Sequence, residues 1–350
     1  MIQPHQPARV AVVGAGAIGR RHLVSLAGIP AFALAGVADP SPDAQAAARA
    51  HGVPCFADLQ RMLDHVAPDA VVIATPNALH EEAALACIAR GVPAMIEKPV
   101  AHSVASARRI AAAASAGAVP ILVGHHRRFN PRLRAARACI DAGTLGRIVA
   151  VTAVDLRRKP DAYYAQAWRR EPGGGPLLIN GIHDVDCLRY LCGEIVSVHA
   201  VKGTAARGFA VEDTAAVAFV FASGALGTLT ISDAVQAPWA WEIASGEEPD
   251  YPHQEEDCYL IAGTAASLAV PTLALWRNER GGGRGDPFVR TRLAAPPADP
   301  WVEELRHFAD VVHGRARPAV TVEDAMRTLA VMEAIAEASR SGAAAAVATP

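Results

Sequence analysis

Lysine is nearly absent from this chain of 350 residues, which has three lysines beside thirty arginines. A lysine retained where arginine supplies the other positive charge suggests a site that needs a compact, titratable ammonium. Lys98 stands where the apolar run Met95–Ile96 ends. It is therefore a candidate catalytic residue, although strand ends are exposed and an ordinary surface lysine before Pro99 is the alternative.

Metal-binding patterns are also missing. The six cysteines include no Cys-x-x-Cys pair, and none of the thirteen histidines forms His-x-x-x-His. These spacings would place two ligands together, so no metal site is predicted. We interpret the cysteines as reduced, mostly buried thiols.

No long hydrophobic run and no strong net charge occur. The stretch Ile110–Ala118 falls short of the roughly twenty apolar residues that span a bilayer. The start, Met1–Arg9, has no apolar signal region, and the net charge of −2 gives no general attraction to nucleic acid or membrane. The sequence predicts a cytoplasmic protein without nucleic-acid or membrane partners.

The first domain is expected at residues 1–125. Short apolar runs alternate there with helical segments, which is typical of a doubly wound parallel sheet in a Rossmann domain. The runs are Val10–Val13, Leu34–Ala38, Ala70–Ala74, Ala94–Ile96 and Ile121–Val123, with a weaker one near Cys55.

A second, α+β domain is expected at residues 126–340. Successive β-type runs separated by turn residues predict a largely antiparallel open sheet. They are Ile148–Leu156, Ile195–Val201, Thr214–Phe221, Leu226–Ser232, Tyr259–Ala262 and Leu268–Trp276. Helices are predicted at 131–142, 177–191, 301–313 and 322–339, a loop at 281–300, and a flexible tail at 341–350. We expect the catalytic cleft between the two domains.

A glycine fingerprint follows the first apolar run. Gly14, Gly16 and Gly19, with Ala17 and Ile18 between them, form Gly-x-Gly-x-x-Gly where a strand turns into a helix. The glycines permit a tight turn, close approach to a pyrophosphate and close helix packing, and the helix N-terminus attracts the anion. This context predicts a dinucleotide site.

Asp39 ends the second run, twenty residues after Gly19. A carboxylate there accepts hydrogen bonds from a ribose diol and repels a 2′-phosphate, so NAD is favoured over NADP. Pro40 and Ser41 add no arginine to balance a phosphate. The alternatives are a chance glycine pattern and an aspartate that only caps the helix starting near Asp43.

Several further motifs occur in a characteristic order. They are Thr75-Pro76-Asn77 with His80, Glu97-Lys98-Pro99, Arg127-Arg128, Trp168-Arg169, and Gly173–Gly175 leading into Ile182-His183-Asp184. With the glycine fingerprint, this set resembles the glucose-fructose oxidoreductase/inositol dehydrogenase (Gfo/Idh/MocA) family over nearly the whole chain.

The resemblance implies a dehydrogenase that uses NAD to move hydride to or from a carbinol of a sugar, cyclitol, sugar acid or related polyol. Lys98 would lie beside the nicotinamide and contact the reacting hydroxyl, and His183 would be the general base. Imidazole suits proton transfer, and an ammonium stabilises developing alkoxide charge. Without the resemblance, a buried histidine bonded to backbone is the preferred interpretation of His183.

The remaining site residues are assigned by position. Expected cofactor contacts, besides the fingerprint, Asp39 and Lys98, are Thr75, Pro76, Asn77, His80, Glu97 and Arg169. Expected substrate contacts are His126, Arg127, Tyr163, Trp168, Asn180 and Asp184. Asn77 and His80 could instead form a turn and cap, Glu97 could simply end its strand, and the arginines could belong to a solvated face.

One position departs from the family pattern. Many members carry an aspartate four residues before the histidine, and this chain has Ile179 there with Asn180 next. Either Asn180, Asp184 or Asp186 substitutes, or the base is less activated and the substrate differs.

Two other functions remain open at this stage. A glycosidase that retains NAD and oxidises its sugar transiently would release sugar without net NADH. A non-catalytic NAD(H)-binding regulator is less favoured because no DNA-binding segment is visible.

The alternating side chains along Gly224–Asp233 leave no strongly polar face on this predicted strand. A homodimer or homotetramer through the second sheet is therefore predicted.

Overall fold

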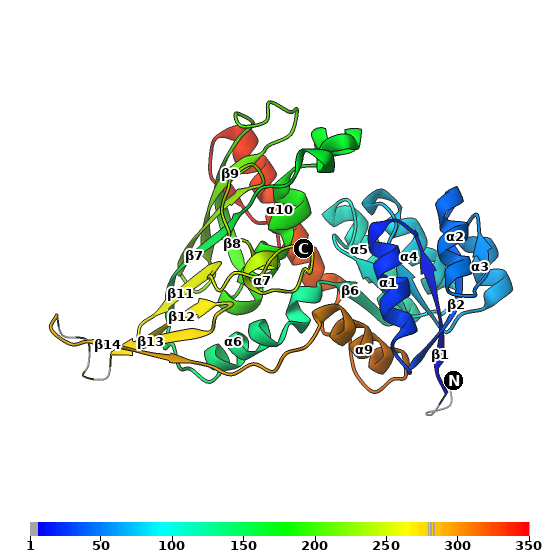
Figure 1. The fold of residues 1–350 in the computed structure, drawn as a ribbon, viewed down its shortest axis with the longest axis horizontal. Helices are drawn as coiled ribbons and strands as arrows, with labels where there is room; N and C mark the ends of the chain where they lie inside the picture. The colour runs from blue at the N-terminus through cyan, green and yellow to red at the C-terminus, as the bar shows by residue number, and fades with distance from the viewer. Residues whose placement is uncertain (1–5, 279, 281, 283, 350) are drawn as a thin grey trace. The chain divides into compact units, whose positions relative to one another are not determined.

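A computed structural model describes residues 6–278, 280, 282 and 284–349 (Figure 1). The chain forms two compact units. The first contains the residues up to His126 together with Asp299–Leu329, and the second contains Arg127–Ala298 and the residues from Ala330. No helix among the described residues is long and apolar enough to cross a membrane.

The first unit is a six-stranded parallel sheet flanked by helices. Its strands are β1 (Ala8–Val13), β2 (Phe32–Ala38), β3 (Cys55–Phe56), β4 (Ala70–Ile73), β5 (Ala94–Glu97) and β6 (Ile121–Gly124), in the order β3-β2-β1-β4-β5-β6. Its helices include α1 (Ala17–Ala27), α2 (Pro42–Ala50), α3 (Leu59–Val66), α4 (His80–Ala89) and α5 (Val104–Gly117). This confirms the predicted doubly wound sheet, in which the ends of β1, β2 and β4 meet at one edge.

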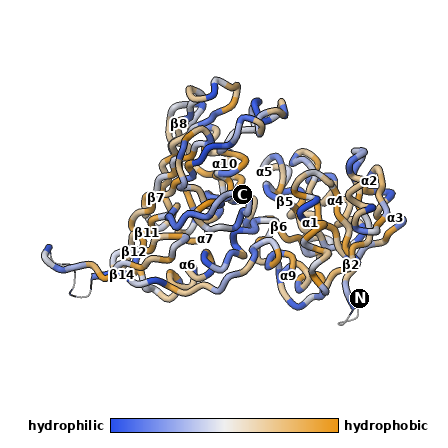
Figure 2. Tube along the Cα trace, viewed as in Figure 1, coloured by the Kyte–Doolittle hydropathy of each residue, from blue (hydrophilic) through white to orange (hydrophobic). Residues whose placement is uncertain are grey.

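Burial explains why these strands are continuous apolar runs. Val10, Val12, Val71 and Val72 have no exposed surface because helices cover both faces of a parallel sheet. Figure 2 shows the same distribution, with hydrophobic residues along the strands and hydrophilic residues mainly in loops.

Residues 299–329 pack with the first unit, whereas the sequence placed them in the second domain. Helix α9 (Pro300–Val312) contacts α1, and the rings of Phe32 and Phe308 lie 5.8 Å apart. The amide of Val123 in β6 donates to the carbonyl of Val320. Helix α10 (Val322–Ser341) begins in the first unit and ends in the second. The apolar face of a helix does not reveal which sheet it will cover, so the sequence could not show this return.

The second unit contains a nine-stranded sheet. Its strands are β7 (Ile148–Leu156), β8 (Ile195–Gly203), β9 (Thr214–Phe221), β10 (Leu226–Ser232), β11 (Tyr259–Gly263), β12 (Ala266–Val270), β13 (Ala274–Asn278), β14 (Phe288–Arg292) and β15 (Ala345–Ala346). The order is β14-β13-β12-β11-β7-β10-β9-β8-β15. Among the described strands of this sheet, only β7 and β10 pair in parallel. The predicted, largely antiparallel sheet is confirmed.

Three segments differ from their predicted form. The run Leu268–Trp276 is a hairpin that turns at Pro271–Leu273, where Leu273 has φ of 63°. The predicted loop at 281–300 contains β14, and its residues 281 and 283 lie outside the described residues. In the predicted flexible tail, β15 pairs with β8, and residue 350 also lies outside the described residues. The strands in these three segments are short. Pairing with a neighbouring strand defines them, and not an alternation of apolar and polar residues in their own sequence.

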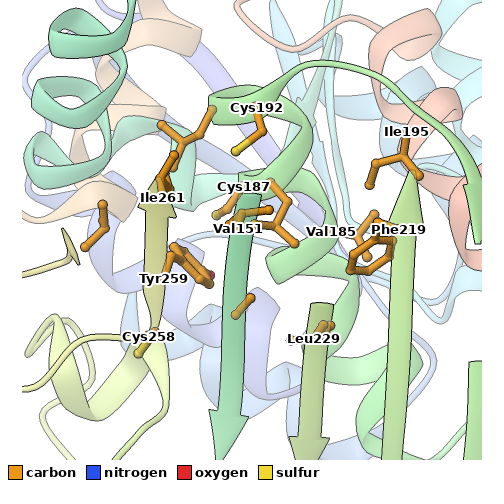
Figure 3. Packing of buried hydrophobic residues seen from close by; sticks show 14 of the residues in the cluster. Val151, Val185, Cys187, Cys192, Ile195, Phe219, Leu229, Cys258, Tyr259 and Ile261 are labelled. Atoms are coloured by element: carbon orange, nitrogen blue, oxygen red, sulfur yellow. The ribbon is translucent and has the colours of Figure 1, made fainter. Parts of the chain in front are cut away.

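One face of the second sheet carries the hydrophobic core. Helices α6 (Pro131–Asp141) and α7 (Ile182–Cys192) and the end of α10 pack on it. Figure 3 shows Val185 and Cys187 of α7 beside Val151, Phe219, Leu229 and Tyr259 of the strands. A π-helical turn, Leu177–Gly181, precedes α7 where the sequence predicted one continuous α-helix. Such turns are rare and often occur at functional sites.

Candidate active site

The turn between β1 and α1 has the geometry that a pyrophosphate needs. Gly14 has φ of 88°, and a Cβ on Gly19 would collide with the carbonyl oxygen of Gly14. A Cβ on Gly16 would meet no protein atom within 4 Å, so this side of the turn is open. Gly16 also leaves α1 without a side-chain cap. The first N–H groups of the helix are therefore left for an anion.

Asp39 is fixed beside this turn. Its carboxylate accepts hydrogen bonds from the backbone amides of Ala15 and Ser41, both at 2.7 Å. Burial raises the pKa of Asp39, but these amides and the charge of Arg20 outweigh it and hold the pKa below its ordinary value. Asp39 is therefore a carboxylate at neutral pH, as ribose recognition requires.

A cavity of about 410 Å³ lies at the edge where β1, β2 and β4 end. Gly14, Asp39, Thr75 and Pro76 line it, so the structure brings together four of the predicted cofactor contacts. Asp58 and Glu82 line it as well, and no basic side chain does. Three carboxylates around one cavity oppose a 2′-phosphate, which fits NAD.

Changing Asp39 to alanine is expected to weaken NAD binding by about 10- to 100-fold, the effect of losing hydrogen bonds to a charged group. NADP binding should fall much less, because the substitution also removes repulsion of the 2′-phosphate. Fluorescence titration with both dinucleotides measures this. Asp58→Asn is the matched control, and equal losses for NAD and NADP in Asp39→Ala would contradict the ribose assignment.

His80 ties together the two loops that carry the predicted nicotinamide-side residues. Its ring nitrogens lie 2.8 Å from the carbonyl oxygen of Pro99 and 2.9 Å from that of Thr75. Burial lowers the pKa of His80, and these two hydrogen bonds only partly oppose the shift. The histidine is 1% exposed and joins these two loops inside the protein. Asn77 opens the short 3₁₀ turn Asn77–Leu79 that precedes α4.

Lys98 follows β5 and is half-buried. It comes directly after Glu97, whose two carboxylate oxygens both bond to protein atoms. Glu97 is 5% exposed, and its Oε1 lies 2.7 Å from Nε2 of His22 while its Oε2 accepts from the amide of Lys98 at 3.2 Å. Burial raises the pKa of Glu97, but His22 and the charges of Lys98 and His126 bring it below its usual value. The carboxylate therefore anchors the strand end that presents Lys98.

His126 belongs to the first unit, although the sequence assigned it to substrate binding in the second domain. Its ring stacks on Trp301 at 4.2 Å, and Trp301 also contacts the ring of His22 at 5.5 Å. His126 is 5% exposed. Its place in this aromatic stack supports the end of β6 and leaves little surface for a ligand.

Arg127 and Asp184 form a buried ion pair in the second unit. Nη1 of Arg127 lies 2.8 Å from Oδ1 of Asp184, which also accepts from Tyr259 at 2.6 Å. Nη2 of Arg127 reaches Glu242 at 3.0 Å. Because these charges are 1% and 0% exposed, they neutralise each other inside the protein, and removing one partner would leave an unpaired buried charge.

His183 is the second residue of α7 and is 6% exposed. Asn180 lies in the π-helical turn before it and is half-buried, and Ile179 is its neighbour. Asp186 is bound by Arg128 at 2.7 Å, which accounts for one of the predicted substitutes for the family aspartate. Of the candidate substitutes, Asn180 alone is partly accessible, since Asp184 and Asp186 are buried.

Tyr163, Trp168 and Arg169 gather on two 3₁₀ turns, Asp161–Ala165 and Ala167–Arg170. The guanidinium of Arg169 lies 3.8 Å from the ring centroid of Tyr163 and donates to the Tyr163 carbonyl at 2.7 Å. Trp168 is 51% exposed and its indole nitrogen donates to Gln166. The structure thus brings two predicted substrate contacts and one predicted cofactor contact into a single surface loop of the second unit.

Sequence reasoning missed three residues in these networks. His22 and Glu242 pair with groups far away in the sequence, and no local signal marks them. Lys159 is different, because the scarcity of lysine that singled out Lys98 applied to it equally. It is 5% exposed, and its Nζ donates to Oδ1 of Asn180 at 2.7 Å.

Comparisons with known proteins show the family to which the chain belongs. The family model described as the oxidoreductase family with an NAD-binding Rossmann fold matches residues 8–125, and the GFO/IDH/MocA C-terminal domain matches residues 133–269. The chain is 30% identical over 288 residues to a 1,5-anhydro-D-fructose reductase from Ensifer adhaerens, which covers 80% of each protein. It is 32% identical over 186 residues to the rhizopine catabolism protein MocA of Rhizobium meliloti, where the match spans only 53% of this chain and 57% of that protein.

A solved structure is also similar over the whole chain. The WlbA dehydrogenase from Bordetella pertussis, in complex with NADH and UDP-GlcNAcA, is 26% identical with a TM-score of 0.79 and covers 98% of this chain and 100% of its own. The glycine turn, Asp39 and the carboxylate-lined cavity fit the same coenzyme. The chain therefore belongs to the Gfo/Idh/MocA oxidoreductase family and is an NAD-binding oxidoreductase.

Proposed function

We propose that this enzyme transfers hydride between NAD and a secondary alcohol carbon of a sugar, cyclitol, sugar acid or related polyol. The observation that carries the proposal is the placement of Lys98. It follows a buried strand end that Glu97 and His22 hold and that His80 ties to the cofactor edge. The names of the relatives, a 1,5-anhydro-D-fructose reductase among them, support the substrate class.

Lys98 is the proposed contact of the reacting hydroxyl. NAD, when bound, would accept the hydride. The carbinol oxygen becomes more negative as its proton is removed, and it loses that charge again as the hydride leaves and the C=O bond forms. A half-buried ammonium stabilises that charge more strongly than water does, because the local dielectric is lower.

His183 is the proposed general base, which removes the hydroxyl proton. It lies at the start of α7, which packs into the core through Val185 and Cys187 (Figure 3). Asp184, the next residue of the helix, is paired with Arg127, and this ion pair holds the first turn of α7 in place. An imidazole on so rigid an element can be held within hydrogen-bond reach of one substrate atom.

The other assignments follow from where the side chains lie. Gly14, Gly16, Ala17, Ile18, Gly19, Asp39, Thr75, Pro76 and Asn77 are proposed to border the cofactor. Asn180, Tyr163 and Trp168 are proposed to contact substrate, with Arg169 beside them. His80, Glu97, His126, Arg127 and Asp184 are proposed to support these groups, since each is buried against other protein atoms.

Incubating the purified protein with NAD and a panel of sugars, cyclitols, sugar acids and other polyols tests the function, with NADH absorbance as the readout. At least one member of the panel should give sustained NADH formation. Release of sugar from glycosides without net NADH would instead indicate a glycosidase that retains NAD. No reaction with any member would contradict the proposal.

A homodimer or homotetramer through the second sheet is proposed as the working assembly. Beyond the core face, the sheet exposes apolar side chains on several strands, including Val220, Leu226 and Leu260, which are 40–59% exposed. Contiguous apolar patches of this kind mark protein interfaces.

The cysteines bear on the compartment in which the protein works. All six are free thiols, which supports a reducing compartment such as the cytoplasm.

The double substitution Leu226→Glu and Leu260→Glu is expected to convert the oligomer to monomers, because it would bury like charges against an apolar surface. Light scattering coupled to gel filtration gives the mass. Val24→Glu on α1, where the valine is 67% exposed, is the control and should leave the mass unchanged. A monomeric wild-type protein would contradict the proposed assembly.

A further inference from the structure

Lys159 is a buried lysine whose role the family motifs do not assign. It follows β7, and its backbone amide donates to the carbonyl of Asp233 at 2.9 Å. Its Nζ lies 2.7 Å from Oδ1 of Asn180, 3.9 Å from Oδ2 of Asp233 and 4.6 Å from the ring centroid of Tyr163. Of these three contacts of Nζ with described residues, only that with Asn180 is a hydrogen bond. The side chain is therefore fixed at both ends, with its charge directed at one amide.

The ammonium is embedded among other charges. Asp155 faces it from β7, Arg157 from the residue that follows β7, Asp233 from the segment after β10, and Glu242 from the short helix α8 (Trp241–Ala244). Burial, followed by the charge of Arg157, lowers the pKa of Lys159 to about 8, and the three carboxylates only partly oppose this shift. The ammonium is thus protonated at neutral pH and loses its charge as the pH rises through about 8.

Asn180 is held in one orientation by charges on both sides of its amide. Its Oδ1 accepts from the ammonium, and its Nδ2 lies 3.5 Å from Oε1 of Glu242. A carbonyl facing a cation and an amino group facing a carboxylate fix which end of the amide is which. The amide is also half-buried, three residues before His183, in the π-helical turn next to Ile179.

We propose that Lys159 is a positioning residue: its ammonium holds Asn180 so that the amide meets a substrate oxygen beside His183, where other family members have an aspartate at the position of Ile179. The inference rests on the proposed function, in which Asn180 contacts substrate. Lys159 acts through Asn180 and does not touch the reacting atoms.

The expected kinetic signature is a rise in KM. Without the ammonium the amide of Asn180 is free to turn away from substrate, and the hydrogen bond then lost is one between neutral groups, worth about 2- to 10-fold in binding. Lys159→Met should therefore raise KM for the polyol by up to about tenfold with a smaller change in kcat, because the reacting groups remain. In the wild type, KM should rise as the pH passes through about 8, and in Lys159→Met it should not.

A double-mutant cycle separates positioning from general structural damage. Asn180→Ala should raise KM by itself, and adding Lys159→Met to it should change KM little, because the two residues act in series. Lys202→Met is the matched control, since the side chain of Lys202 is 46% exposed. Kd for NAD should remain unchanged in all variants.

A substrate-independent readout uses the scarcity of lysine. Protein grown with lysine labelled with ¹³C at the ε-carbon should give three signals, and Lys159→Met identifies the one that belongs to Lys159. That signal should titrate near pH 8, and Asn180→Ala should move both its position and its titration.

Three results would each overturn the inference. The first is a double variant whose rise in KM is the product of the two single rises, and the second is an unchanged KM in Lys159→Met. The third is a Lys159 signal that Asn180→Ala does not move. Failure of the proposed function is recognised separately, because the wild-type enzyme would then produce no NADH from any polyol, whatever the NMR spectra show.

Discussion

Replacing Lys98 with methionine is expected to lower kcat by about 10³-fold, near the upper end of the effects seen when one group that stabilises a developing oxyanion is removed. Methionine keeps the length and apolar stem of lysine but removes the charge. Because Glu97 is held by His22 and by the backbone amide at position 98, the strand end should keep its shape. The loss should therefore be catalytic and not structural.

The measurements that check this are kcat on the best polyol of the panel, Kd for NAD and the melting temperature. The affinity for NAD and the melting temperature should match the wild type, since the glycine turn and Asp39 are untouched. Lys202→Met, with a solvent-exposed lysine, is the control for loss of a positive charge. A near-normal kcat in Lys98→Met would remove Lys98 from the mechanism.

Replacing His183 with asparagine is expected to lower kcat/KM by about 10²- to 10⁴-fold, the usual contribution of a general base. The wild-type kcat/KM should also fall at acidic pH, because a protonated imidazole cannot accept the hydroxyl proton. The variant should lack this acid limb. Its remaining activity should depend on pH only through other groups.

The pH profile is the decisive readout for His183, because misfolding would lower activity without removing the acid limb. A second variant, His183→Ala, leaves space in which free imidazole can act as a base. Added imidazole should raise its activity and have no such effect on Lys98→Met. Retention of the acid limb in His183→Asn would assign the base to another residue.

Long apolar runs could be predicted from the sequence because burial determines them directly. Each predicted strand of the first sheet is present, since residues such as Val12 and Val72 are buried on both faces. Short strands could not be predicted reliably. Phe288–Arg292 is largely exposed and is a strand only because β13 pairs with it. Pro271, which interrupts the run Leu268–Trp276, was the available signal for the hairpin there.

The site could be predicted only where chemistry is encoded locally. The glycine fingerprint and Asp39 depend on spacing within one βαβ unit, and they lie together as expected. By contrast, the charge pairs that support the site join residues far apart in sequence. Arg127 was expected to contact substrate, but its partners Asp184 and Glu242 lie 57 and 115 residues away. No periodicity reveals that such a charge is already neutralised.

The central claim is that Lys98 and His183 act together on one carbinol oxygen of a polyol in the presence of NAD. NADH formation by the wild type, Lys98→Met, His183→Asn and the double variant on the same substrate tests it most directly. We predict turnover by the wild type and a double variant little slower than the slower single variant, because residues that act as a unit are not additive. Losses that multiply, or no turnover by the wild type, would contradict the account.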